Sequence, residues 1–116
     1  MTLDEYQNAT KATVFYLKPV AEQLGPDRAF LYATLGLVGE AGEVADKVKK
    51  VIRDNGGVIS DAVRGNLAKE LGDVLWYLAR LAADVGLSLD EIARMNIEKL
   101  ESRKERGALQ GSGDAR

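Results

Sequence analysis

Four acidic side chains occur in two pairs with the same internal spacing. Glu40 and Glu43 are three residues apart, and so are Glu70 and Asp73. Helical residues at this spacing leave the same face within one turn, so each pair can offer two carboxylates to a common point. The chain has no histidine and no cysteine, so any metal must be held by oxygen. Oxygen ligands favour Mg²⁺, with Mn²⁺ as a possible substitute.

The apolar residues around the two acidic pairs repeat one pattern. Leucine, valine and alanine recur at helical spacing around Glu40, and the same arrangement returns thirty positions later around Glu70. Packing these two apolar faces together would bring the four acids to one rim. Crowded carboxylates repel one another, and a divalent cation carrying a phosphate-bearing substrate would relieve the repulsion. One such pair alone would more simply be a solvated helix face, but two matched pairs favour a functional site.

Three polar side chains on the last expected helix suggest that it binds an anion. Asn96, Lys99 and Arg103 recur at helical spacing on the side expected to face the core. A metal-bound polyphosphate would satisfy them, with Arg103 as a planar donor and Lys99 as a point charge. The alternative is that these two cations only extend from a core face into water, which explains either one taken alone equally well.

Two further side chains occupy equivalent positions beside the acids. Lys47 follows Glu43 by four residues, and Tyr77 follows Asp73 by four. Either could contact a phosphate or a base. The simpler interpretations are an ion pair between Lys47 and Glu43 along one helix, and partial burial of Tyr77 with its hydroxyl in water.

Glycines stand at positions 36, 39 and 42 of the same helical segment. Each costs about 1 kcal/mol relative to alanine in a helix, so we expect something to approach closely there. Another helix, a substrate base or a simple packing notch would each account for them.

The composition excludes several classes of protein. The 116 residues carry a net charge of −2 with both signs interspersed, so nucleic acid is not an expected partner. The first residues do not resemble a signal peptide, and no segment is apolar for long enough to cross a bilayer. We therefore expect a cytoplasmic protein without a membrane partner. The absence of histidine also excludes a ferritin-like di-iron site.

The pattern predicts an all-α protein built as a four-helix bundle, in one domain over residues 1–106. A Thr-x-x-Glu capping box opens the first helix, expected over residues 2–24 with a kink at Pro19. The second helix ends near residue 54, the third spans about 61–85, and a second capping box at Ser88 opens the fourth, which ends near residue 104. Residues 107–116 form a glycine-rich tail. Sustained two-residue alternation, the signature of strands, is missing.

With these residues identified, the chain resembles the MazG-like members of the all-helical nucleoside triphosphate pyrophosphatase superfamily. The resemblance covers most of the chain and rests on Glu40-x-x-Glu43 followed by Glu70-x-x-Asp73. It implies Mg²⁺-dependent hydrolysis of ribo- or deoxyribonucleoside triphosphates between the α and β phosphates, yielding a nucleoside monophosphate and pyrophosphate. The four acids would bind the metal, and Lys47, Tyr77, Asn96, Lys99 and Arg103 would bind the substrate.

The resemblance departs from the family pattern at one position. Many members have a further Glu immediately before the first motif acid, where this chain has Gly39. The resemblance therefore does not fix the group that activates water. Among the expected catalytic residues, Glu40 and Glu43, we favour Glu40, or a water that it holds, as the base.

The apolar residues at the start of the second helix surround it almost completely, and a four-helix layer cannot cover them all. A second apolar face usually meets a partner subunit, so we expect a homodimer or a homotetramer. The rival hypothesis is a non-catalytic helical dimerisation or regulatory module. That module would explain the apolar faces but not the matched acidic pairs.

Overall fold

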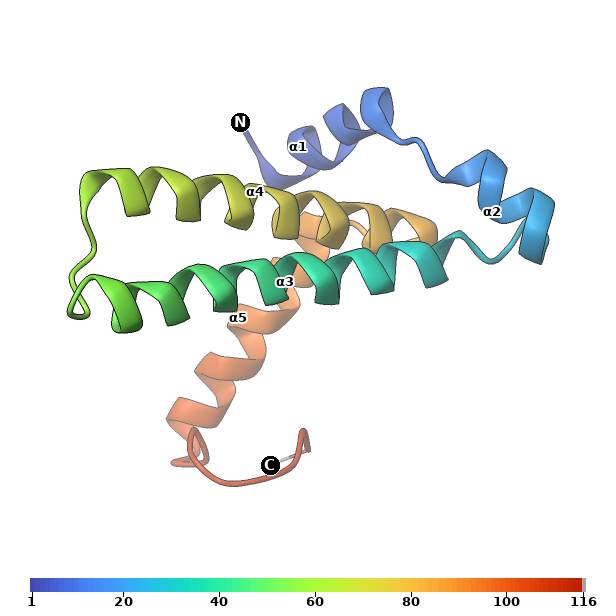
Figure 1. The fold of residues 1–116 in the computed structure, drawn as a ribbon. Helices are drawn as coiled ribbons and strands as arrows, with labels where there is room; N and C mark the ends of the chain where they lie inside the picture. The colour runs from blue at the N-terminus through green and yellow to red at the C-terminus, as the bar shows by residue number, and fades with distance from the viewer. Residues whose placement is uncertain (116) are drawn as a thin grey trace.

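The computed structural model describes residues 1–115, so residue 116 of the predicted tail lies outside them. All regular elements in this part of the chain are helices (Figure 1). In order they are α1 (Leu3–Ala9), the 3-10 turn η1 (Thr10–Thr13), α2 (Leu17–Leu24), α3 (Ala29–Asp54), α4 (Asp61–Asp84) and α5 (Leu89–Glu105). The all-helical prediction is confirmed.

The N-terminal segment is two short helices rather than one helix kinked at Pro19. The hydroxyl of Thr10 donates to the carbonyl of Gln7 at 2.6 Å, and that of Thr13 donates to the carbonyl of Thr10 at 3.2 Å. Threonine hydroxyls compete in this way with helical backbone bonds. The α-helix therefore tightens into a 3-10 turn and ends at Val14, which is extended. Pro19 instead lies in the first turn of α2, where proline is tolerated.

The long helices α3 and α4 form an antiparallel hairpin, which is the main structural unit of the molecule (Figure 1). Gly56 and Gly57 make the turn between them with φ values of 59° and 78°, which only glycine adopts without strain. Ser60 then caps α4 by accepting a hydrogen bond from the backbone N–H of Val63 at 3.2 Å. The two long helices thus pack on each other, as expected, although Val48, Leu71 and Leu78 of the predicted apolar faces remain exposed.

Helix α5 is fastened at its first turn and then leaves the hairpin (Figure 1). The Asp4 carboxylate accepts from the backbone N–H of Asp90 at 3.0 Å and from the Ser88 hydroxyl at 3.2 Å. The Gln7 side-chain oxygen accepts from the N–H of Leu89 at 2.9 Å. The Ser88 hydroxyl caps α5 by accepting from the N–H of Glu91, and helix α1 supplies further acceptors at the same helix end.

The polar stripe of α5 does not face the core of this chain, so that prediction is wrong. Asn96 and Lys99 are exposed. Arg103 is buried, but its guanidinium donates to the backbone carbonyl of Asp114 at 2.6 Å in the tail that folds back on the helix. The physical reason is that, in the described residues 1–115, α5 packs on α4 near its N-terminal end and then projects away from α3 and α4 (Figure 1), so it does not form a fourth wall there.

The buried core is small and is crossed by a polar network. One apolar cluster contains Tyr16, Val20 and Ala33, and the Tyr16 hydroxyl donates to Asp84 at 2.7 Å. Arg80, itself buried, lies 3.8 Å from Asp84 and donates to the Thr10 hydroxyl at 3.2 Å. This network holds the irregular N-terminal segment against α4.

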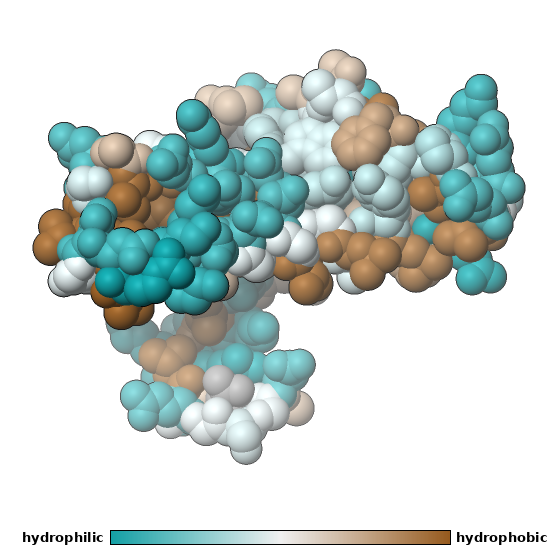
Figure 2. Space-filling view, in the orientation of Figure 1, coloured by the Kyte–Doolittle hydropathy of each residue, from teal (hydrophilic) through white to brown (hydrophobic). Residues whose placement is uncertain are grey.

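Many large apolar side chains remain on the surface. Leu35 and Val38 of α3 are 73% and 67% exposed, and hydrophobic atoms follow the lower edge of that helix in Figure 2. None of the described helices combines the length and the apolarity that a membrane span needs. The exposed apolar side chains form a surface that the described part of the chain does not cover.

Candidate active site

Three of the predicted acids meet between the two long helices. Glu40 comes from α3, and Glu70 and Asp73 come from successive turns of α4. One carboxylate oxygen from each lies within 4.8 Å of the others. Oxygens bound to one Mg²⁺ at about 2.1 Å are at most about 4.2 Å apart, so small side-chain rotations would gather them around a single ion. The residues present therefore fit a hard divalent cation.

Glu43 stands apart from this close cluster. Its side chain is exposed one turn further along α3, and it is not among the three acids whose oxygens converge. It still acts on the site electrostatically, because its negative charge helps to raise the pKa of Glu40. The structure thus brings three of the four predicted acids together and keeps the fourth beside them.

The electrostatics of the cluster favour a cation. The pKa of Glu40 is raised, first by partial burial and then by the charges of Asp73, Glu70 and Glu43. Lys47 supplies a counter-charge, with its Nζ 3.9 Å from Glu70 Oε1. Its ion pair therefore crosses to the opposite helix instead of following the expected path to Glu43. A bound divalent ion would neutralise the cluster and release this lysine.

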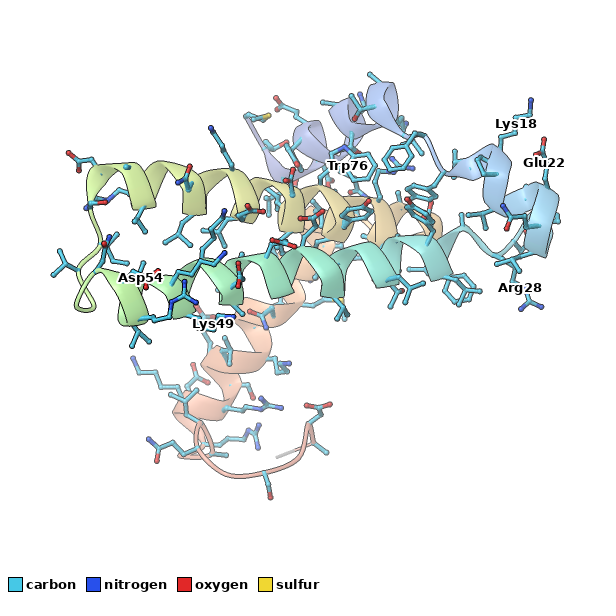
Figure 3. All side chains as sticks on the ribbon, viewed as in Figure 1. Lys18, Glu22, Arg28, Lys49, Asp54 and Trp76 are labelled. Atoms are coloured by element: carbon cyan, nitrogen blue, oxygen red, sulfur yellow. The ribbon has the colours of Figure 1, made fainter. Side chains whose placement is uncertain are left out.

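An aromatic hollow of about 430 Å³ opens beside the acids. Glu40 and Asp73 form one wall, and the remaining lining residues are Thr13, Phe15, Trp76 and Tyr77. The Phe15 and Trp76 rings are stacked, with centroids 6.0 Å apart and planes 14° from parallel. The Trp76 indole N–H donates to the Thr13 hydroxyl at 2.8 Å, and Figure 3 shows Trp76 on the side of α4 that faces the N-terminal segment. Such a rigid aromatic wall can hold a planar ring.

Sequence reasoning did not find Thr13 or place Phe15 in the site. Both lie in the irregular segment around the end of η1, where helical periodicity carries no information about direction. Only the tertiary contact between this segment and α4 brings them beside the acids.

Tyr77 is seated in a notch made by Gly36. A Cβ at position 36 would lie no more than 2.5 Å from three carbons of the Tyr77 ring, whereas at Gly39 and Gly42 it would meet nothing within 4 Å. Of the three glycines at which a close approach was expected, Gly36 alone shows one, and it is a packing notch for the Tyr77 ring. Burial raises the pKa of Tyr77, with further contributions from Tyr32, Glu40 and Asp73. The ring thus stands between the hydrophobic helix contact and the acids.

Asn96, Lys99 and Arg103 lie outside this site in the single chain. All three belong to α5, which leads away from the hairpin (Figure 1). Lys47 and Tyr77, by contrast, do lie beside the acidic cluster. Two of the five residues predicted to bind substrate therefore lie beside the acids within one chain, and their role stays a prediction.

Together, the fold and the site define a class: an all-helical protein with a carboxylate cluster between two antiparallel helices and an aromatic hollow next to it. Residues 29–107 match the model of the MazG nucleotide pyrophosphohydrolase domain. The chain belongs to that family. It is also 48% identical over 116 residues to the "Gene 37 protein" of Mycobacterium phage L5, with both chains covered in full. No solved structure matches significantly.

Proposed function

We propose that this protein hydrolyses ribo- or deoxyribonucleoside triphosphates between the α and β phosphates, releasing a nucleoside monophosphate and pyrophosphate. The observation that carries the proposal is the convergence of Glu40, Glu70 and Asp73 next to the hollow lined by Phe15 and Trp76. The acids suit a metal-bound phosphate, and the stacked rings suit a nucleobase. The family to which the chain belongs supports the same reaction class.

In this proposal Glu40, Glu70 and Asp73 hold Mg²⁺, or Mn²⁺ in its place, and Glu43 contributes from the next turn. The metal would polarise a phosphate oxygen and lower the pKa of a bound water. Glu40 is the preferred base, directly or through a water that it holds, because its carboxylate borders both the acidic cluster and the aromatic hollow. It takes the proton as the water oxygen bonds to phosphorus and the bond to the leaving pyrophosphate breaks.

The substrate's base would stack in the aromatic hollow. The Trp76 N–H already donates to the Thr13 hydroxyl, so the indole offers the base its face rather than its polar edge. Tyr77, held against α3 by the Gly36 notch, would complete this wall. Positioning by rigid groups of this kind is a major contribution to catalysis.

The test is to incubate the purified protein with a panel of ribo- and deoxyribonucleoside triphosphates, with and without Mg²⁺, and to separate the products by ion-exchange chromatography. We expect monophosphate and pyrophosphate only with metal, and a loss of at least a hundredfold in the Glu70→Gln and Asp73→Asn variants. The matched control is Glu105→Gln, which removes an exposed acid at the far end of α5 and should leave the rate unchanged. Folded protein without turnover of any triphosphate would refute the proposal.

We also propose that a second copy of the chain covers the exposed apolar surface, giving a homodimer or a homotetramer made of paired dimers. The accessible surface is 8050 Å², whereas a compact monomer of 12.6 kDa is expected to expose about 6200 Å². The excess is larger than the roughly 800 Å² that each partner buries in a standard interface. Such an assembly would also give α5, with Asn96 and Lys99, a surface to pack against.

Light scattering on the wild-type protein and on a Leu35→Asp variant tests this assembly. We expect a dimer or tetramer for the wild type and dissociation by the charged variant, because Leu35 is among the most exposed apolar residues of α3. A monomeric wild-type protein at micromolar concentration would contradict it. A stable oligomer without catalytic activity would instead favour the non-catalytic dimerisation module.

A further inference from the structure

A second hollow, of about 270 Å³, lies further along the same pair of helices. It is formed by the C-terminal part of α3 and the N-terminal part of α4, on the opposite side of the acidic cluster from the aromatic hollow. Its polar lining residues are Lys47, Lys50, Asp54, Asn55 and Asn66. In Figure 3, Asp54 marks this end of the hairpin and Trp76 marks the aromatic side.

Both helices present the three features in the same spatial order. From the C-terminal half of α4 toward its N-terminus, the aromatic pair Trp76 and Tyr77 is followed by the acids Asp73 and Glu70 and then by Asn66. Helix α3 runs in the opposite direction. From its N-terminus toward its C-terminus, it presents the Gly36 notch that holds Tyr77, then Glu40, and then Lys47 and Lys50. Seven residues separate Glu40 from Lys47 in the sequence, which is about 10 Å along a helix. The contact of Lys47 with Glu70 fixes this register.

The second hollow carries a net positive charge once its ion pairs are counted. Both oxygens of Asp54 are bonded by Arg53, at 2.8 Å each. The Asp46 carboxylate is shared by Lys49 at 3.1 Å and Lys50 at 2.7 Å, so it neutralises only one of these two cations. Lys47 is held loosely, at 3.9 Å from Glu70, and is released if Glu70 binds a metal.

This order of features matches the order of groups in a nucleoside triphosphate. The molecule has a planar base at one end, phosphates that bind metal in the middle and further anionic phosphates at the other end. Ammonium groups and side-chain amides are suitable donors for those terminal oxygens.

We propose that the second hollow binds the β and γ phosphates of the substrate, with Lys50 and Asn66 as binding residues not identified from the sequence and Lys47 joining them once metal is bound. This inference rests on the proposed function and adds a direction to it. The substrate lies along the groove between α3 and α4 with its base at Trp76 and its terminal phosphate at Lys50. The hollow therefore selects triphosphates over shorter nucleotides and is the site that retains the pyrophosphate product.

The test uses inorganic pyrophosphate with Mg²⁺ as the probe, measured by titration calorimetry, together with the KM for a nucleoside triphosphate. Lys50→Ala and Asn66→Ala should each weaken pyrophosphate binding by about tenfold, because each removes a direct phosphate contact. They should raise the KM for the triphosphate by a similar factor while binding of the nucleoside monophosphate stays within twofold. The two residues come from opposite walls, so their agreement locates the ligand between α3 and α4.

Lys49→Ala is the matched control. It removes the same charge from the neighbouring position and the same partner, Asp46, but Lys49 is exposed and does not line the hollow. We expect it to leave pyrophosphate binding unchanged. Equal losses in Lys49→Ala and Lys50→Ala, or an unchanged affinity in Lys50→Ala and Asn66→Ala, would overturn the proposal.

This outcome is separate from the fate of the proposed function. If the wild-type protein hydrolyses triphosphates but the Lys50 and Asn66 variants bind pyrophosphate normally, only the second hollow is refuted. If the wild-type protein neither hydrolyses triphosphates nor binds pyrophosphate with Mg²⁺, the reaction itself is wrong, and this inference falls with it.

Discussion

Replacing Gly36 by alanine should move the Tyr77 ring and impair the site without touching an acid. The new Cβ would lie no more than 2.5 Å from three ring carbons, whereas ordinary contacts begin at 3.4 Å. The ring must therefore retreat by about 1 Å, a displacement that can cost on the order of a hundredfold in rate when it misplaces a reacting group. Trp76 contacts Tyr77 edge to face, with ring centroids 5.0 Å apart and planes 87° from parallel, so retreat disturbs the aromatic wall as well.

The expected change in stability is a balance of two terms. Alanine in place of a helical glycine contributes about 1 kcal/mol of stability, while overpacking a filled notch costs about 1 to 3 kcal/mol. Gly36→Ala should therefore lower the free energy of unfolding by about 0 to 2 kcal/mol. Gly39→Ala is the control on the same helix, because its Cβ meets nothing within 4 Å. It should stabilise the protein by up to about 1 kcal/mol.

Urea denaturation and triphosphate turnover of four proteins would measure these effects: the wild type, Gly36→Ala, Tyr77→Leu and the double variant. The smaller leucine removes the ring atoms that meet the new Cβ, so the double variant should be more stable than the sum of the single changes predicts. The notch argument is refuted if Gly36→Ala is as stable and as active as Gly39→Ala and the coupling energy is zero.

Three further changes test the electrostatics and the anchoring of the fold. Without metal, the raised pKa of Glu40 means that the folded state favours the protonated carboxyl, so stability falls as pH rises above the ordinary pKa of a glutamate. In EDTA at pH 7, Glu40→Gln should therefore raise Tm. A lower Tm would contradict this sign. Tyr16→Phe leaves the buried Asp84 side chain without its 2.7 Å donor, so urea denaturation should show a free energy of unfolding lower by about 1 to 3 kcal/mol. An unchanged free energy of unfolding would mean that the network is dispensable. Asp4→Ala removes the acceptor of the Asp90 N–H and of the Ser88 hydroxyl and should cost about 1 kcal/mol, with faster hydrogen exchange in the first turn of α5. Unchanged exchange would argue against that anchor.

The sequence was sufficient for the features that depend on local chemistry. The capping box at Ser88 predicted the start of α5 closely, because a helix end is determined by whether its free N–H groups find nearby acceptors. The matched apolar stripes predicted that the two long helices pack together, since burying both faces satisfies the same periodicity. Once that pairing holds, the convergence of Glu40 with Glu70 and Asp73 follows from helix geometry alone.

Tertiary structure alone decided the remaining features, because they depend on contacts between segments with no common period. Phe15 and Thr13 reach the site because the Arg80 and Asp84 network holds their irregular segment on α4. The first turn of α5 is anchored by hydrogen bonds to Asp4 and Gln7 from the other end of the chain, which no stripe on α5 reveals. Sequence periodicity specifies which face of a helix is apolar, but only packing specifies what that face meets.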